Sequence, residues 1–204
     1  LTGSEETSYY KFQKVLNTDK FKYNDIESLK KIISKHKKNS ESDIYALIVE
    51  PMNASSLLSC SEEFLREARD ICDKEGIILI FDEIYTGWCK TGKLFYFMNF
   101  ENLAPDILLS AKSLGGGKSS ISSYTCKKNI FEKTYDNLRD ATLHSTTYNG
   151  FGEETLTAIE AINVMVDEKF YDKSKEIGQY IKNSLDVLYK KHNGLIEEIR
   201  GTGC

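Results

Sequence analysis

Short runs of apolar residues alternate along the chain with stretches in which apolar residues recur every three or four positions. Residues 45–49 and 77–81 are continuous apolar runs, which is the pattern of strands buried on both faces. Between them, apolar residues at helical spacing predict a helix that Gly76 ends: Phe64, Leu65, Ala68, Ile71 and Cys72. A strand, a helix and a strand of these lengths predict two parallel strands in one sheet.

The rest of the chain continues this alternation. Residues 107–109 and 121–126 predict two more strands, and residues 127–137, 156–166 and 177–188 predict helices. A further strand is predicted from residue 194. Two capping boxes are predicted, one from Asn24 with Glu27 and one from Ser59 with Glu62. The sequence therefore predicts an α/β fold.

Composition, charge and cysteine spacing limit the partners and the metal sites that we expect. The net charge of the 204 residues is −4, and the basic residues are spread along helix faces, so we expect no nucleic-acid partner. No apolar run is long enough to cross a bilayer, so we expect no membrane partner. The five cysteines form no C-x-x-C pair and no metal-ligand spacing with the three histidines. We predict free thiols, no metal site and a cytoplasmic location.

The chain begins without methionine and ends at Gly-Thr-Gly-Cys. We interpret it as a fragment of a longer protein.

Chemically useful side chains follow two of the predicted strands. Asp82 comes directly after the strand at 77–81, and Lys112 comes shortly after the strand at 107–109. Open α/β sheets bind ligands beyond the carboxyl ends of their strands. Partial burial there would lower the pKa of a lysine and favour imine formation, and the three glycines after Leu114 would let a planar ligand approach the backbone. The simpler alternatives are that Lys112 is solvated and that Asp82 caps a turn.

Two further segments suggest phosphate binding. Thr146, Thr147 and the turn at Gly150 precede a predicted helix, whose free N–H groups would favour an anion. The segment GGGKSS is similar to the phosphate loop of nucleotide hydrolases, but Lys112 stands where that loop needs its first glycine. A strand, not a helix, is predicted after it.

Several spaced motifs together resemble one family, the class III aminotransferases of fold type I, which depend on pyridoxal phosphate. The similar segments are FDEIYTGWCKTGKLF, APDILLSAKSLGGG and HSTTYNGFG, supported by YNDIESL, ALIVEP and EEIRGTG. The resemblance implies a large domain with a mixed, mainly parallel sheet flanked by helices. It also implies that residues 1–193 belong to the large domain and that residues 194–204 begin a truncated small C-terminal domain.

The same resemblance implies roles for individual residues. Lys112 would be the Schiff-base lysine, and Asp82 would pair with the pyridine nitrogen of pyridoxal phosphate. Thr147 would bind the cofactor phosphate of the neighbouring subunit, which implies a homodimer with shared active sites. Tyr85 lies where many members have a glutamine near the ring hydroxyl, and Glu50 matches a glutamate on the substrate side.

The implied reaction moves an amino group from an amino acid or amine donor to a keto acid or aldehyde acceptor. Two alternatives remain open at this point. One is another pyridoxal phosphate chemistry on the same fold, such as that of an aminomutase, a racemase or a decarboxylase. The other is a protein without catalysis, either a phosphate-binding α/β module that uses residues 115–119 or a degenerate scaffold. The segments MNASSLLSCS and KSSISS depart from the family pattern and border the substrate pocket.

Overall fold

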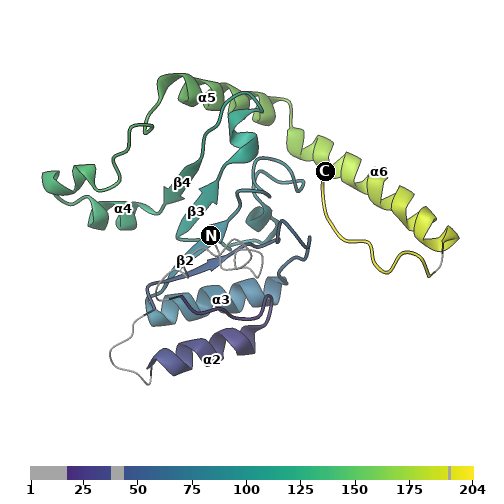
Figure 1. Ribbon diagram of the computed structural model, residues 1–204, viewed down its shortest axis with the longest axis horizontal. Helices are drawn as coiled ribbons and strands as arrows, with labels where there is room; N and C mark the ends of the chain where they lie inside the picture. Colours follow the sequence, from purple (N-terminus) through teal and green to yellow (C-terminus); the bar gives the residue numbers. More distant parts are fainter. Residues whose placement is uncertain (1–17, 38–43, 193) are drawn as a thin grey trace, which may run out of the picture. The chain divides into compact units, whose positions relative to one another are not determined.

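The computed structural model describes residues 18–37, 44–192 and 194–204 (Figure 1). The chain forms two compact units, residues 1–44 and residues 45–204. Residues 18–23 form no helix or strand.

The first unit contains helix α2, Ile26–Lys37. Its N-terminal cap is Asp25, whose Oδ1 accepts a hydrogen bond from the Ser28 N–H at 2.9 Å. The predicted capping box is therefore wrong. Asn24 has a left-handed backbone (φ 56°), and the Glu27 side chain pairs with Lys30 at 3.0 Å instead of reaching back to the cap.

The second unit contains a four-stranded sheet in the order β1-β2-β3-β4. The strands are Ala46–Val49 (β1), Ile78–Asp82 (β2), Ile107–Ser110 (β3) and Ser123–Cys126 (β4). The first three strands are parallel, and β4 pairs with β3 in the antiparallel sense. This arrangement confirms the predicted strands and the mixed, mainly parallel sheet.

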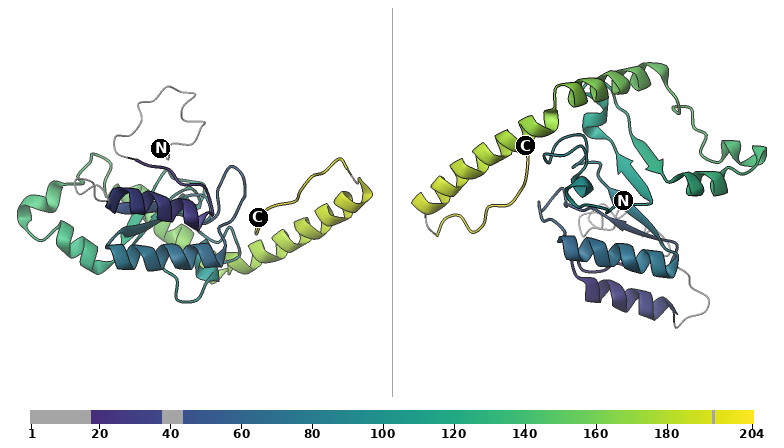
Figure 2. Two further views of the ribbon diagram at one scale, coloured as in Figure 1. Left: turned by 90° about the horizontal axis from the view of Figure 1, so that it is seen from below. Right: turned by 180° about the vertical axis from the view of Figure 1, so that it is seen from behind.

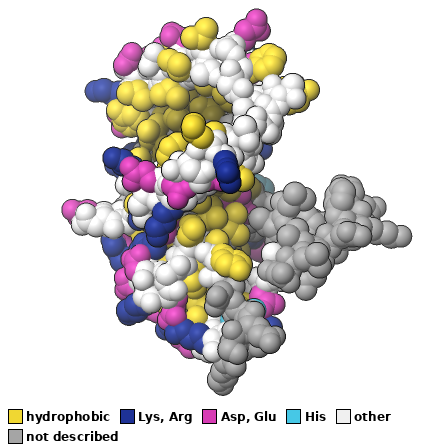
Figure 3. All heavy atoms as spheres, turned by 90° about the vertical axis from the view of Figure 1, so that its left-hand side faces the viewer, with side chains coloured by type: hydrophobic (Ala, Val, Ile, Leu, Met, Phe, Trp, Pro, Cys, Tyr) yellow, Lys and Arg dark blue, Asp and Glu magenta, His cyan; other side chains and the backbone are white. Residues whose placement is uncertain are grey.

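The two faces of the sheet differ in burial. Leu47, Val49, Leu79 and Phe81 share one face and are buried. On the opposite face, Ile48 remains 44% exposed. Figure 3 shows hydrophobic side chains gathered in groups at the surface, between charged side chains.

Helix α3, Glu62–Glu75, connects β1 to β2 and contacts β2. Ser61 is its N-cap and accepts a hydrogen bond from the Phe64 N–H at 3.1 Å. The prediction of Ser59 as the cap is wrong, because Ser59 forms a β-bridge with Met52. Gly76 ends the helix in a left-handed conformation (φ 68°), as predicted.

The remaining elements follow β2, β3 and β4 in the sequence. The short helices η1, Tyr96–Asn99, and η2, Lys112–Gly115, follow β2 and β3. After β4 come α4, Lys128–Thr134, then η3, Leu138–Thr142, α5, Gly152–Asp167, and α6, Phe170–Lys191. Figure 2 shows that α4 and the segment after it extend away from the sheet in both views.

The strand predicted from residue 194 is wrong. Residues 194–204 form no strand. Arg200 donates instead to the Ser56 carbonyl at 3.1 Å, and the Cys204 N–H donates to the Lys90 carbonyl at 3.0 Å. The segment therefore runs across two loops and does not extend the sheet.

Within the part of the chain that the structure describes, no helix has the length and apolar character that crossing a membrane requires.

Candidate active site

Asp82 and Lys112 leave the carboxyl ends of neighbouring parallel strands. Asp82 is the last residue of β2 and lies in register with Leu109 of β3, three residues before Lys112. The Glu83 N–H extends the ladder by donating to the Leu109 carbonyl at 3.1 Å. The sheet thus brings the two predicted residues to one edge, as their positions in the sequence predict.

Lys112 has an unusual backbone for a lysine. Its φ is 49°, in the left-handed region, and the preceding Ala111 has φ −162° and ψ −145°. Such a conformation costs about 1–3 kcal/mol for a residue other than glycine, and residues of this kind concentrate at functional sites. The expected partial burial of Lys112 is wrong for this chain, because its side chain is exposed: β3 ends just before it and η2 turns away.

The Asp82 carboxylate is half-buried and mostly unpaired. Its Oδ1 accepts a hydrogen bond from the Ile84 N–H at 3.0 Å, so the expected turn cap is present. Among the described residues no other donor contacts this carboxylate. One of its oxygens is therefore available to a ligand with a positive charge or an N–H group.

Glu83 is a buried carboxylate that the sequence did not single out. It is 0% exposed, and its oxygens accept from Thr86 Oγ1 at 3.0 Å, from the Tyr96 N–H at 2.6 Å and from the Phe97 N–H at 2.9 Å. Burial raises its pKa, and these hydrogen bonds oppose the rise. Glu83 therefore fixes the loop that follows Asp82. The signal in the sequence was alternation, since Glu83 continues the buried face of Leu79 and Phe81.

The three glycines after Leu114 differ in what surrounds them. A Cβ on Gly116 would lie 2.9 Å from the Ala161 Cβ of α5, and a Cβ on Gly115 would lie 3.1 Å from Ser119 Oγ. Gly116 also has φ 60°. Gly116 therefore allows η2 to approach α5 closely, and side-chain atoms of Ala161 and Ser119 occupy the space beside Gly116 and Gly115, whereas a Cβ on Gly117 would meet no atom within 4 Å.

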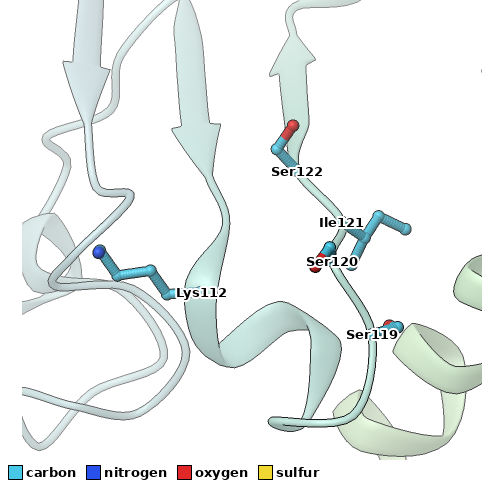
Figure 4. Close-up of a pocket in the computed structure, with 5 residues that line it drawn as sticks. All are labelled: Lys112, Ser119, Ser120, Ile121 and Ser122. Atoms are coloured by element: carbon cyan, nitrogen blue, oxygen red, sulfur yellow. The ribbon is translucent and has the colours of Figure 1, made fainter. Parts of the chain in front are cut away.

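A cavity of about 440 Å³ adjoins the lysine. It is lined by Lys112, Ser119, Ser120, Ile121 and Ser122. Figure 4 shows that the Lys112 amine points away from residues 119–122, towards the segment that follows the neighbouring strand β2. The amine is thus directed to the side on which Asp82 ends its strand.

Tyr85 and Glu50 lie in loops at the same edge of the sheet. Tyr85 is half-buried, and the Lys90 ammonium lies 5.5 Å from the centre of its ring. Glu50 follows β1, and its two oxygens accept from Asn53 Nδ2 and from the Ala54 N–H, each at 3.0 Å. Glu50 therefore closes the turn after β1.

Thr147 is not brought to this site within the chain. It is exposed, in the segment between η3 and α5, and Figure 1 shows this segment beyond the free edge of β4. Helix α5 also carries Glu153 and Glu154 in its first turn, which disfavours an anion at its N-terminus.

Sequence and structure comparisons with known proteins both find aminotransferases. A sequence model of the family described as aminotransferase class III matches residues 4–204. The fold is similar to that of acetylornithine aminotransferase from Elizabethkingia anophelis, with 31% identity and a TM-score of 0.76, covering 89% of this chain and 45% of that one.

Two more solved structures extend the similarity. Ornithine aminotransferase from Toxoplasma gondii, in a structure described as having partial occupancy of pyridoxal phosphate at its active site, is 28% identical with a TM-score of 0.79, covering 94% of this chain and 43% of that one. An (S)-enantioselective omega-transaminase from Thermomicrobium roseum is 26% identical with a TM-score of 0.78, covering 87% and 38%. The predicted fold class is confirmed, and the chain spans less than half the length of these proteins.

Proposed function

The chain belongs to the class III aminotransferase family, and from that premise we propose that the protein is a pyridoxal phosphate-dependent aminotransferase in which Lys112 holds the cofactor. The observation that carries this proposal is the placement of Asp82 and Lys112 at the ends of neighbouring parallel strands. Bound pyridoxal phosphate supplies a ring that accepts the electron pair released when the substrate Cα loses a proton. It would be held at the site described above.

Asp82 would hold the ring nitrogen. One of its carboxylate oxygens accepts from Ile84, which fixes the orientation of the group, and the other is available to a protonated nitrogen. A protonated ring nitrogen beside the Asp82 carboxylate would be stabilised by its negative charge. Asp82 would thereby keep the positive charge on the ring.

Lys112 would provide the amine that binds the cofactor and, once released, moves a proton. Its exposed side chain and the direction of its amine leave the nitrogen accessible from the side of β2. The left-handed backbone of Lys112 fixes the point, just after β3, from which its side chain leaves the main chain. A flexible side chain on a fixed backbone position suits an amine that must reach both a cofactor and the substrate Cα.

Tyr85 and Glu50 would complete the edge of the site. Tyr85 carries a phenol in the loop that Glu83 fixes, and we propose that this phenol contacts the ring hydroxyl of the cofactor. Glu50 borders the substrate side, and the Asn53 and Ala54 donors hold its carboxylate in one orientation. The substrates of the protein would be small amino donors and keto-acid or aldehyde acceptors.

Thr147 would act in a second copy of the protein. Its exposed segment lies beyond β4, the edge strand of the sheet, which fits a hydroxyl that binds the cofactor phosphate of a neighbouring subunit. We therefore propose a homodimer with shared active sites, located in the cytoplasm. Residues 194–204 would begin the small C-terminal domain.

The direct test is Lys112→Ala in the full-length protein. We expect loss of the imine absorbance of the bound cofactor and loss of turnover, because no amine remains to bind it covalently. The matched control is Lys118→Ala, which removes an exposed lysine from the same turn and should leave the spectrum unchanged. If Lys112→Ala retains both absorbance and turnover, Lys112 does not have this role.

A further inference from the structure

Cys89 and Cys204 lie close together although they are far apart in the sequence. The Cys204 N–H donates a hydrogen bond to the carbonyl of Lys90, the residue after Cys89, at 3.0 Å. Both Figure 1 and Figure 2 show the end of the chain beside α6. Residue 204 therefore lies against the loop that carries Cys89.

Helix α6 holds both thiols. Ser174 Oγ lies 3.3 Å from Cys204 Sγ. Burial raises the pKa of the Cys89 thiol, and a hydrogen bond from the Tyr171 backbone opposes this rise. Tyr171 and Ser174 are three residues apart on one helix, so they lie on the same face within one turn. The two sulfur atoms thus contact adjacent positions on the first turns of α6.

Two glycines fix this arrangement. A Cβ on Gly178 of α6 would lie 2.5 Å from the Gly203 carbonyl oxygen, and a Cβ on Gly203 would overlap the Lys90 carbonyl oxygen. Gly203 therefore lies between α6 and the loop at residues 90–91, with no room for a side chain on either glycine. This close approach determines where the next residue, Cys204, lies.

The backbone of Cys89 is strained. Its φ is 72°, in the left-handed region, and its side chain is only 2% exposed. A cysteine in this conformation costs free energy that a glycine would not. Cys204, in contrast, is exposed in the described chain, and Cys89 is enclosed beside it.

We propose that Cys89 and Cys204 form a redox-active dithiol whose co-substrate is a low-molecular-weight disulfide. The Cys204 thiolate attacks one sulfur of the small disulfide, which breaks the S–S bond and releases one small thiolate. The Cys89 thiolate then attacks Cys204 Sγ, forms the Cys89–Cys204 bond and releases the second small thiolate. The two cysteine protons pass through solvent to the two leaving thiolates, so two protein thiols are oxidised and one small disulfide is reduced.

The bond would connect residues 194–204 to the loop that follows β2. That loop also carries Tyr85 and is fixed by Glu83. Oxidation would therefore restrain the loop at the candidate active site. The dithiol does not depend on the proposed aminotransferase function, since its chemistry involves neither Asp82 nor Lys112.

To test this, the full-length protein is treated with glutathione disulfide. The pH is near 8.5, about the ordinary pKa of a cysteine, so that part of the exposed thiol is ionised. Free thiols are then alkylated, and the protein is digested without reduction and mapped by mass spectrometry. We expect a peptide pair joined through Cys89 and Cys204. Cys204→Ser should abolish it. Cys89→Gly, which suits the left-handed backbone, should instead accumulate glutathione on Cys204, and Cys126→Ser is the matched control that leaves the joined pair unchanged.

Two outcomes would overturn the proposal. One is stable glutathione on Cys204 of the wild type with no joined pair, which would mean that Cys89 cannot reach it. The other is a wild-type protein that forms neither the joined pair nor a glutathione adduct on Cys204. Both are read from peptides, so neither depends on whether the protein transaminates.

Discussion

Glu83 shows how a single buried carboxylate can position a site that it does not form. Three donors from the following loop converge on it, and burial raises its pKa above the ordinary value for a glutamate. Its backbone N–H meanwhile pairs with β3. The residue therefore connects the end of β2 to the start of η1, with Asp82 immediately before it.

We predict that Glu83→Ala destabilises the full-length protein by more than about 3 kcal/mol, because it leaves three buried donors without an acceptor. The free energy of unfolding from urea titration measures this. Glu176→Ala is the control: Glu176 is exposed on α6, so its change should stay within about 0.5 kcal/mol. Equal effects of the two variants would show that Glu83 does not organise the loop.

The placement of Asp82 and Lys112 at the ends of neighbouring strands could be predicted from the sequence, and the role of Glu83 could not. A carboxylate and an amine directly after apolar runs point to a strand edge whatever the details of packing. The burial of Glu83 depends on Tyr96 and Phe97, thirteen and fourteen residues further along. No local pattern shows that this loop folds back to supply those donors.

Asp106 connects several elements at the opposite end of the strands. Its carboxylate accepts from Arg69 of α3 and from the Leu79 N–H of β2, at 2.9 and 2.8 Å, and from Lys127 after β4 at 2.7 Å. Burial opposes the charged form, but the hydrogen bonds from these donors outweigh it and hold the pKa of Asp106 below its ordinary value. The helix, the central strand and the edge strand are thus joined through one side chain.

The lowered pKa of Asp106 makes the free energy of unfolding depend on pH. Because the folded pKa is depressed, the stability that Asp106 contributes is present above its unfolded pKa of about 3.9 and is lost as pH falls through the folded value. We predict that Asp106→Asn lowers the free energy of unfolding at pH 7 by about 1–3 kcal/mol. It should also flatten the decline of stability in acid.

Unfolding titrations at pH 7 and at acid pH measure both effects. Asp73→Asn is the control, since Asp73 also pairs with Arg69 but is 63% exposed, and its loss should cost about 0–1 kcal/mol. An Asp106→Asn protein that is as stable as the wild type at pH 7 would contradict the role of Asp106.

Elements were predicted well where periodicity is strong and poorly at their ends. All four strands and the helices α3, α5 and α6 follow from apolar spacing. The caps were misplaced by one or two residues, because Asn24 and Asp25, or Ser59 and Ser61, offer similar side chains and only the backbone selects between them. The strand predicted from residue 194 is absent, and the segment contacts loops through the Cys204 N–H and the Arg200 side chain and not a strand edge.

The molecule as a whole leaves apolar surface that the described chain does not cover. Leu156 and Ile159 of α5 are 69% and 50% exposed, and Tyr180 of α6 is 74% exposed. Exposed apolar side chains of this kind mark surfaces that further chain or a partner covers. Thr147, which the resemblance assigns to the cofactor phosphate of a neighbouring subunit, lies in the exposed segment between η3 and α5, and its role stays a prediction.

The most direct measurement is chemical trapping of the cofactor. The full-length protein is mixed with pyridoxal phosphate, reduced with borohydride and digested, and the modified lysine is identified by mass spectrometry. We predict one pyridoxyl adduct, on Lys112, that disappears in Lys112→Ala and persists in Lys118→Ala. An adduct on another lysine, or none at all, would contradict the assignment of this strand edge as the cofactor site.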